Sequence, residues 1–235
     1  MGDYIVIFDS VSKFYHSRLG VNDISFRVNC GEIVGCIGPN GAGKTTISKL
    51  MAGLLKPTRG IVKVFGENPF NNVNIKFRIG LLLDFDGMYD ELTVYDNLLF
   101  LSRAYNLDAG RSKLKDLLRQ VGLEDELDTI VGKLSKGMRR RLSLVGALIH
   151  DPELLILDEP LVFLDLTWQE RIKRLIRSLR DEGKTIFITS NDLMLVDDLA
   201  EKIILLDKGR LVIQGVKSEI KEMLSRGVVK VTFFD

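Results

Sequence analysis

The sequence predicts an α/β fold with a largely parallel central sheet, an N-terminal antiparallel β region and an inserted helical lobe. Short apolar runs alternate with amphipathic stretches along the 235 residues, and strands separated by helices favour a parallel sheet. Residues 87–150 interrupt this alternation, because they show helical periodicity and no convincing strand. We therefore expect a single domain, residues 1–235, in which residues 1–86 and 151–217 form the core, residues 87–150 the helical lobe and residues 218–235 a short C-terminal extension.

The expected strands are short apolar runs. The runs "YIVIF" and "ISFRV" near the N-terminus have the period of two that is typical of strands. Further strands are expected at "EIVGCIG", "GIVKVFG", "RIGLLL", "ELLILD" and "TIFITS". A "KG" turn between "KIILLD" and "RLVIQG" indicates a hairpin, and a short helix and "VVKVTFF" close the chain.

Four stretches have the apolar spacing of amphipathic helices. The first, "KTTISKLMAGLL", is expected to end at Lys56 and Pro57. The second covers residues 93–123, with Thr93 as a plausible N-cap. The apolar faces of the first, third and fourth contain Ile47, Leu50, Met51 and Leu54; Met138, Leu142, Val145, Leu148 and Ile149; and Trp168, Ile172, Leu175, Ile176 and Leu179.

The charge balance argues against a dedicated nucleic-acid-binding protein. Lys and Arg total 33 and Asp and Glu total 32, a net charge of +1, whereas such proteins usually carry a clear basic excess. Cys30 and Cys36 flank or enter an apolar run, so we expect buried free thiols in a reducing compartment. The first apolar run is not preceded by the basic segment that a signal peptide requires. The sequence also has no run of 18 apolar residues that could span a membrane. We therefore expect a cytoplasmic location.

A glycine-rich loop between a strand and a helix carries the clearest chemical signal. The stretch "GPNGAGKTT" fits G-x-x-x-x-G-K-[ST] in the strand–loop–helix context that a phosphate-binding P-loop requires. The glycines let backbone N–H groups surround phosphate oxygens. Lys44 would reach the β- and γ-phosphates, and the Thr45 hydroxyl would bind Mg²⁺. The expected nucleotide-binding residues of this loop are Gly38, Pro39, Asn40, Gly41, Ala42, Gly43, Lys44, Thr45 and Thr46.

Two adjacent carboxylates follow a second buried strand. In "LLILDEP" four apolar residues bury the strand and bring Asp158 to its end, beside the P-loop. Asp158 would hold Mg²⁺ directly or through water. Glu159 would orient and deprotonate an attacking water molecule. Together with the P-loop, this pair predicts a P-loop NTPase core.

The stretch "LSKGM" lies just upstream of these carboxylates and opens a helix. Here the chain resembles the ATP-binding cassette (ABC) family, whose signature usually reads LSGGQ. The resemblance covers about residues 5–215 and is closest to the ATPase subunits of bacterial and archaeal export-type transporters. It implies that Ser135 and Gly137 face the γ-phosphate of ATP bound by a second cassette. It also implies that the helical lobe receives a short helix from a separate membrane subunit.

The resemblance assigns roles to other positions. Tyr15 occupies the place of the aromatic residue that stacks on adenine, although Phe14 is an alternative. In the loop after the carboxylates, which contacts the partner cassette in the family, Val162 and Phe163 replace small and hydroxyl residues. These two side chains are expected to pack either on the partner or on the core.

Two positions near the expected phosphates depart from the family pattern. Asp84 stands where the family usually has Gln, sometimes Glu; Asp can still ligate Mg²⁺ but lacks an amide donor. Asn191 stands where the family has a His that contacts the γ-phosphate. Losing one well-aimed donor costs about 10²- to 10³-fold in rate, so we expect ATP binding to survive and hydrolysis to be slowed. An Asn191 that still reaches the phosphate is the alternative.

Three consecutive arginines, residues 139–141, follow the signature. We expect them to form the solvated, charged side of the signature helix. Direct contact with nucleic acid, and contact with a phosphate or a partner, are the alternatives.

The resemblance predicts an ATP-binding and ATP-hydrolysing subunit of an ABC transporter. It would dimerise around MgATP with an identical or different cassette and drive a separate transmembrane permease subunit. The permease would hold it at the inner face of the cell membrane, and no direct contact with nucleic acid is expected. One alternative is a non-catalytic, ATP-gated regulatory or assembly subunit, which the departures at Asp84 and Asn191 keep open. The other is a soluble non-transport ABC ATPase, which usually carries a coiled-coil insertion, zinc modules or two cassettes.

Overall fold

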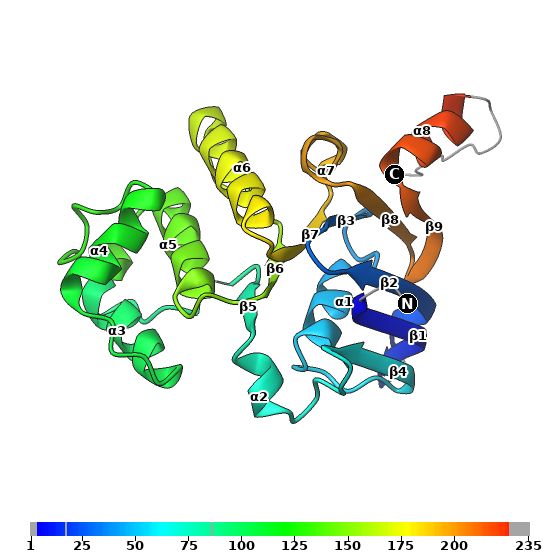
Figure 1. Cartoon of the computed structure of the whole chain (residues 1–235), viewed down its shortest axis with the longest axis horizontal. Helices are drawn as coiled ribbons and strands as arrows, with labels where there is room; N and C mark the ends of the chain where they lie inside the picture. Colours follow the sequence, from blue (N-terminus) through cyan, green and yellow to red (C-terminus); the bar gives the residue numbers. More distant parts are fainter. Residues whose placement is uncertain (1–3, 17, 86, 226–235) are drawn as a thin grey trace.

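The computed structural model describes residues 4–16, 18–85 and 87–225, which form two β-sheets and surrounding helices (Figure 1). An antiparallel sheet has the strand order β2–β1–β4, and a six-stranded sheet has the order β5–β6–β7–β3–β8–β9. The six-stranded sheet is parallel except for its β8–β9 hairpin. The predicted fold class, largely parallel sheet and N-terminal antiparallel region are confirmed. The strands are β1 (Tyr4–Tyr15), β2 (Arg18–Asn29), β3 (Ile33–Ile37), β4 (Arg59–Val64), β5 (Ile79–Leu82), β6 (Leu154–Asp158), β7 (Thr185–Ser190), β8 (Lys202–Asp207) and β9 (Arg210–Val216).

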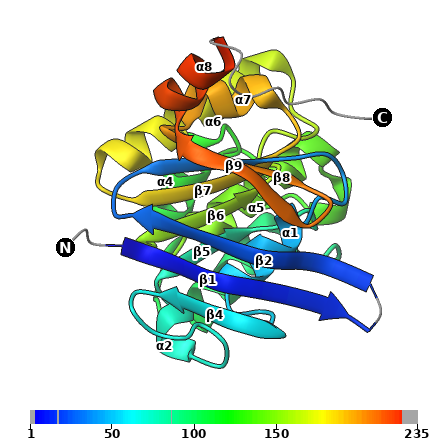
Figure 2. The same ribbon diagram turned by 90° about the vertical axis from the view of Figure 1, so that its right-hand side faces the viewer.

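Helices cover the six-stranded sheet, and a separate group of helices is formed by the chain segment that connects β5 to β6. Figure 1 shows α3, α4 and α5 at the opposite end of the molecule from the antiparallel sheet, and Figure 2 shows that sheet with β1 between β2 and β4. The helices are α1 (Lys44–Met51), α2 (Val73–Lys76), α3 (Val94–Ala104), α4 (Arg111–Gln120), α5 (Lys136–Leu148), α6 (Leu166–Asp181), α7 (Leu193–Leu199) and α8 (Lys217–Ser225), with a 3₁₀ turn at Val131–Lys133.

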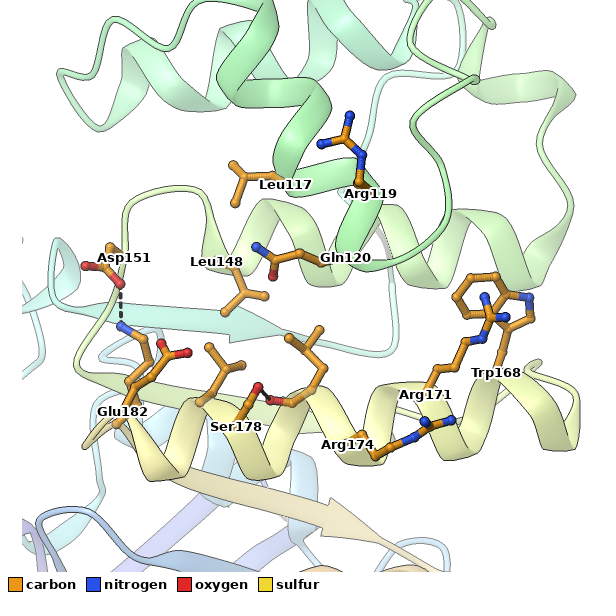
Figure 3. A pocket seen from close by; sticks show the side chains of 13 residues that line it. Leu117, Arg119, Gln120, Leu148, Asp151, Trp168, Arg171, Arg174, Ser178 and Glu182 are labelled. Atoms are coloured by element: carbon orange, nitrogen blue, oxygen red, sulfur yellow. Dashed lines mark hydrogen bonds and ion pairs between the residues drawn. The ribbon is translucent and has the colours of Figure 1, made fainter.

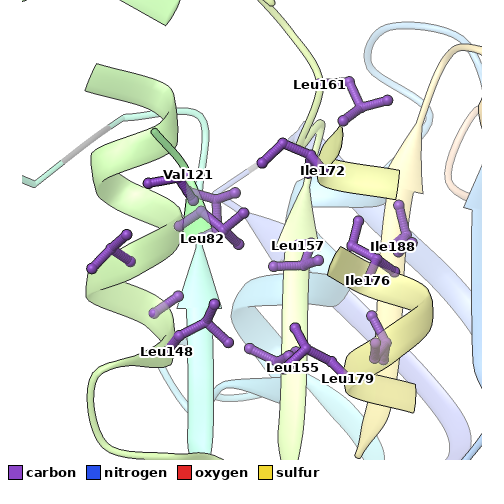
Figure 4. Close-up of a cluster of buried hydrophobic side chains, with 14 of the residues drawn as sticks. Leu82, Val121, Leu148, Leu155, Leu157, Leu161, Ile172, Ile176, Leu179 and Ile188 are labelled. Carbon is purple, nitrogen blue, oxygen red and sulfur yellow. The ribbon is translucent and has the colours of Figure 1, made fainter. Parts of the chain in front are cut away.

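Strand β6, which lies between β5 and β7, contributes to an apolar core on each face of its sheet. Leu154 and Ile156 join the cluster under the antiparallel sheet and α1. Leu155 and Leu157 point the other way and pack with residues of α5 and α6 (Figure 4). Because successive strand residues face opposite sides, one apolar run is buried on both faces. Each such side chain stabilises the fold by about 1.5–3 kcal/mol.

Side-chain caps start the first and the last helix of residues 87–150, α3 and α5. The Thr93 hydroxyl accepts a hydrogen bond from the Asp96 N–H at 3.0 Å and starts α3. The Ser135 hydroxyl accepts one from the Met138 N–H at 3.2 Å and starts α5. Within the described part of residues 87–150, strand-like pairing is limited to an isolated bridge between Thr93 and Ile130.

Three details of the sequence prediction need correction or fall outside the structure. Helix α1 ends at Met51 rather than near Lys56, because Gly53 adopts a left-handed φ of 67° that ends the turn, and Leu54 is therefore 47% exposed. Cys36 is a buried free thiol as predicted, whereas Cys30 is exposed. The predicted "VVKVTFF" strand, residues 228–234, lies outside the described residues.

No helix in the described ranges is both long and apolar enough to cross a membrane.

Candidate functional site

The glycine-rich loop joins the end of β3 to the start of α1. Gly43 precedes the helix with φ of 106°, and no side chain caps the helix N-terminus. A Cβ on Gly43 would lie 2.7 Å from the Gly20 carbonyl oxygen, and one on Gly38 would lie 2.5 Å from the Leu206 carbonyl oxygen. Glycine is therefore required at both ends of the loop. The uncapped helix start leaves N–H donors available to an anion.

Lys44 lies at the centre of this loop and is 7% exposed. Its ammonium group donates to the carbonyl oxygens of Gly38 at 2.6 Å and Pro39 at 3.2 Å. It also lies 3.7 Å from a carboxylate oxygen of Glu159. A buried cation therefore connects the loop to the end of β6.

Asp158 ends β6 and is 1% exposed, with both carboxylate oxygens hydrogen-bonded. Thr45 donates to one oxygen at 2.7 Å, and Thr189 donates to the other. Thr189 is reached because it lies opposite Asp158 in the parallel register of β6 and β7. Sequence reasoning missed Thr189, although its place at the carboxyl end of a parallel strand is a detectable signal.

Glu159 follows Asp158 in a left-handed backbone conformation, with φ of 50°. Its two carboxylate oxygens accept hydrogen bonds from the Ser190 hydroxyl at 3.0 Å and from the Asn191 backbone N–H at 2.9 Å. Two donors after β7 thus fix the direction of this carboxylate. Asn191 makes this contact through its main chain, and the residue is exposed. The sequence interpretation considered the Asn191 side chain alone and missed Ser190.

A cavity of about 480 Å³ is lined by Lys44, Asp158 and Glu159. The other lining residues expected from the sequence are Tyr15, Asn40, Gly41, Gly43, Thr45, Thr46 and Asp84. The Tyr15 hydroxyl lies 3.3 Å from the Thr46 hydroxyl oxygen, at the end of the cavity formed by the β1–β2 hairpin. Phe14, the alternative aromatic residue, is not among the described residues that line the cavity. Asp84 is exposed at the cavity wall. Sequence analysis did not single out the remaining lining residues Arg18, Leu19 and Gly20.

Ser135 and Gly137 lie at the start of α5 and are not among the lining residues of this cavity in the described structure. A Cβ on Gly137 would lie 2.8 Å from the backbone oxygen of Phe163. The side chain of Phe163 is 62% exposed, and the Lys136 ammonium lies 5.3 Å from its ring centre. The glycine therefore already has a packing reason within the chain, and Phe163 is not part of the core.

The prediction of a solvated arginine face is wrong for Arg140 and Arg141, whereas Arg139 is partly exposed and pairs with Asp90 at 2.6 Å. Arg140 and Arg141 are only 6% and 8% exposed. Arg141 donates to the Val121 carbonyl at 2.6 Å and stacks on the Trp168 ring at 3.8 Å, and burial lowers the pKa of its guanidinium. Arg140 donates to main-chain carbonyls near the carboxylates of β6. Charge alone misled the prediction, because a guanidinium can be buried when carbonyl oxygens satisfy its fixed N–H donors.

A separate cleft of about 630 Å³ lies between α4, α5 and α6 (Figure 3). Arg171 lies over the Trp168 ring at 4.7 Å, and Lys184 pairs with Asp151 across the cleft floor. This cleft shares no lining residue with the cavity at the P-loop. Size therefore does not identify the functional site; the converging charged groups of the smaller cavity do.

Comparison with known proteins agrees with this geometry. The family model described as "ABC transporter" matches residues 21–162. The chain belongs to the ABC transporter family. It is 38% identical over 218 residues to the Nod factor export ATP-binding protein I of Burkholderia orbicola (strain AU 1054), covering 92% of this chain and 72% of that protein. It is 35% identical over 206 residues to the ABC transporter ATP-binding protein NatA of Bacillus subtilis (strain 168), covering 86% and 84%.

A solved ABC structure shares the fold along almost its whole length. The dimeric ATP-binding cassette MJ0796, bound to ADP and Pi in a post-hydrolysis state, superposes with a TM-score of 0.83 at 25% identity, covering 90% of this chain and 98% of that chain. The predicted relationship to export-type ABC ATPases is confirmed, and the chain is an ATP-binding ATPase subunit of an ABC transporter.

Proposed function

We propose that this ABC ATPase subunit pairs with a second cassette around MgATP, hydrolyses it slowly and drives a separate transmembrane permease. The observation that carries the proposal is the contact network of Lys44, Thr45, Asp158 and Glu159 around one cavity. The remaining expected ATP contacts, Ser135 and Gly137, lie outside that cavity. One chain therefore offers most, but not all, of the groups that the family uses to enclose ATP.

The phosphates of ATP would bind in the loop of residues 38–46. Its glycine backbone and the uncapped start of α1 supply N–H donors. The Lys44 ammonium would turn from its carbonyl partners towards the β- and γ-phosphates, which are stronger acceptors because they are charged. Tyr15, at the far end of the cavity, would then stack on the adenine.

Thr45 and Asp158 fit a Mg²⁺ site because a hydroxyl and a carboxylate oxygen lie 2.7 Å apart at the base of the cavity. Mg²⁺ commonly binds one or two carboxylates together with substrate phosphates and waters. Asp84, on the cavity wall, would add a carboxylate directly or through water. Bound Mg²⁺ would neutralise charge on the phosphates.

Glu159 would act as the general base for the attacking water. Its carboxylate is oriented by Ser190 and the Asn191 main chain, and it lies 3.7 Å from the Lys44 ammonium. The Asn191 side chain would donate to the γ-phosphate in place of the family's histidine. Because the amide is shorter and cannot become positively charged, we propose that hydrolysis is slowed rather than abolished.

A second cassette, identical or different, would complete the site with its Ser135 and Gly137. Phe163, whose backbone packs on Gly137, is exposed, and Met194 in α7 is 81% exposed; both exposed apolar side chains support a partner surface. The dimeric state of MJ0796 and the export names of the relatives support the pairing and the permease partner. Attachment to such a permease would hold the subunit at the cytoplasmic face of the membrane.

The experiment is ATP-dependent dimerisation of Glu159→Gln. This change removes the general base but keeps an amide whose oxygen can accept from the Asn191 N–H and whose NH₂ can donate to the Ser190 hydroxyl oxygen, so we expect phosphate release to stop and a dimer to accumulate in MgATP. Light scattering and phosphate release are the measurements. Glu182→Gln, at an exposed position after α6, is the matched control and should behave as wild type. A monomer at saturating MgATP would contradict pairing between identical chains.

A further inference from the structure

Arg140 extends from the second turn of α5 to the ends of two strands of the central sheet. Its guanidinium donates to the carbonyl oxygens of Leu83 and Asp158, and to that of Glu159 at 2.9 Å. Leu83 directly precedes Asp84, and the other two are the residues that carry the Mg²⁺ and base carboxylates. One buried side chain thus contacts the main chain at three points beneath the ATP cavity.

The contact is specific to a guanidinium. Its planar fork presents several N–H donors in fixed directions, so it can bind carbonyls from two strand ends at the same time. A lysine keeps the charge but is a point donor on a flexible stem. The position therefore uses the shape of arginine as well as its charge.

The neighbouring arginines hold different parts of the chain. Arg139 pairs with Asp90 at 2.6 Å, and Arg141 donates to the Val121 carbonyl at 2.6 Å. Both of these partners lie between β5 and β6 in the chain, in the helical part of the molecule. Arg140, by contrast, donates to the main-chain carbonyl oxygens of Asp158 and Glu159, the two residues whose carboxylates face the cavity.

Arg140 also lies one helical turn after Gly137, on the same side of α5. If the subunit pairs as proposed above, Gly137 faces ATP on the partner while Arg140 contacts the carboxylate strand of its own site. Glu159 has a left-handed φ of 50°, and its main chain is held by the Thr189 carbonyl on one side and by Arg140 on the other. A tilt of α5 would move the guanidinium and the carbonyls bound to it.

We propose that Arg140 is a positioning residue that couples the two ATP sites of the dimer. Contact of Ser135 and Gly137 with the partner's nucleotide fixes α5. Arg140 then fixes the main chain that aims Asp158 and Glu159 at the nucleotide of its own subunit. Coupling of this kind needs a contiguous physical connection between the sites, and Arg140 provides it within one side chain.

The test is Arg140→Lys, with Arg140→Met as a second variant and Arg139→Lys as the matched control. We expect Arg140→Lys to melt near the wild-type temperature, keep its ATP affinity and KM, and lose about 10- to 100-fold in kcat, because a small misplacement of reacting groups is sufficient. Arg140→Met should lose at least as much, and Arg139→Lys should retain wild-type turnover. An unchanged kcat in Arg140→Lys would remove the positioning role, whether or not Arg140→Met folds.

Mixing experiments separate coupling from a purely local role. In an equal mixture of wild type and Asp158→Asn, wild-type sites should stay active whatever their partner, which leaves about half of the turnover. In an equal mixture of wild type and Arg140→Lys, wild-type sites opposite a variant should also slow, because the α5 that the variant no longer anchors carries the Ser135 and Gly137 that contact the partner's nucleotide; this leaves about a quarter of the turnover. Equal losses in the two mixtures would reject the coupling. If Glu159→Gln fails to dimerise, the proposed function fails instead, and the kcat of Arg140→Lys still tests the positioning role alone.

Discussion

The P-loop cavity and the start of α5 carry the two most recognisable motifs of this chain, and their contacts differ. In the cavity the motif residues contact one another: Lys44 lies beside Glu159, and Thr45 donates to Asp158. At the start of α5, Ser135 caps its own helix and Gly137 packs on the Phe163 backbone. The cavity is thus assembled within the chain, whereas we propose that the signature completes a site on a second cassette. Mutations in the two regions should consequently affect different steps.

The largest effect is expected from Lys44→Ala, which removes the cation of the cavity. Loss of charge-assisted hydrogen bonds to the phosphates should weaken MgATP binding by about 100-fold. Calorimetric titration measures this affinity. Lys49→Ala, in the last turn of the same helix, is the matched control and should bind ATP normally. Equal affinity of Lys44→Ala and wild type would show that the loop is not the phosphate site.

A smaller and different effect is expected from Gly137→Ala. The added methyl group meets the Phe163 carbonyl oxygen at 2.8 Å, so the loop after β6 must shift. We expect ATP affinity to stay unchanged while turnover falls by about 10-fold, because the proposed contact of Gly137 with the partner's nucleotide exists only in the paired state. Gly110→Ala is the control, since nothing lies near its added carbon. Weakened ATP binding by isolated Gly137→Ala would contradict the separation of the two regions.

The smallest effect is expected from Asn191→His, a gain. Its backbone N–H can still hold Glu159, while the longer, chargeable ring would reach the γ-phosphate better. Steady-state phosphate release should rise by about 3- to 10-fold at equal ATP affinity. This gain is smaller than a fully restored donor provides, because we propose that Asp84 also limits the rate. A brisk wild-type rate that the substitution leaves unchanged would show that Asn191 is sufficient.

The sequence by itself determined the parts of the molecule that are local in the chain. The P-loop, the carboxylates at the end of β6 and the caps at Thr93 and Ser135 depend on residues within one strand, turn or helix start, and apolar periodicity was enough to predict the parallel sheet. The resemblance to the ABC family predicted ATP as the ligand and a second cassette as the partner, because the order of the motifs can be read along the sequence.

Only the tertiary structure decided which distant groups meet. Thr189 reaches Asp158 through the parallel register of β6 and β7, a pairing of residues 31 positions apart. Arg140 and Arg141 look like a solvated charge run in the sequence, yet carbonyls from other elements satisfy their guanidinium groups in the interior. The physical reason is that burial of a charge depends on whether partners converge on it in space, and a run of three identical letters contains no record of those partners.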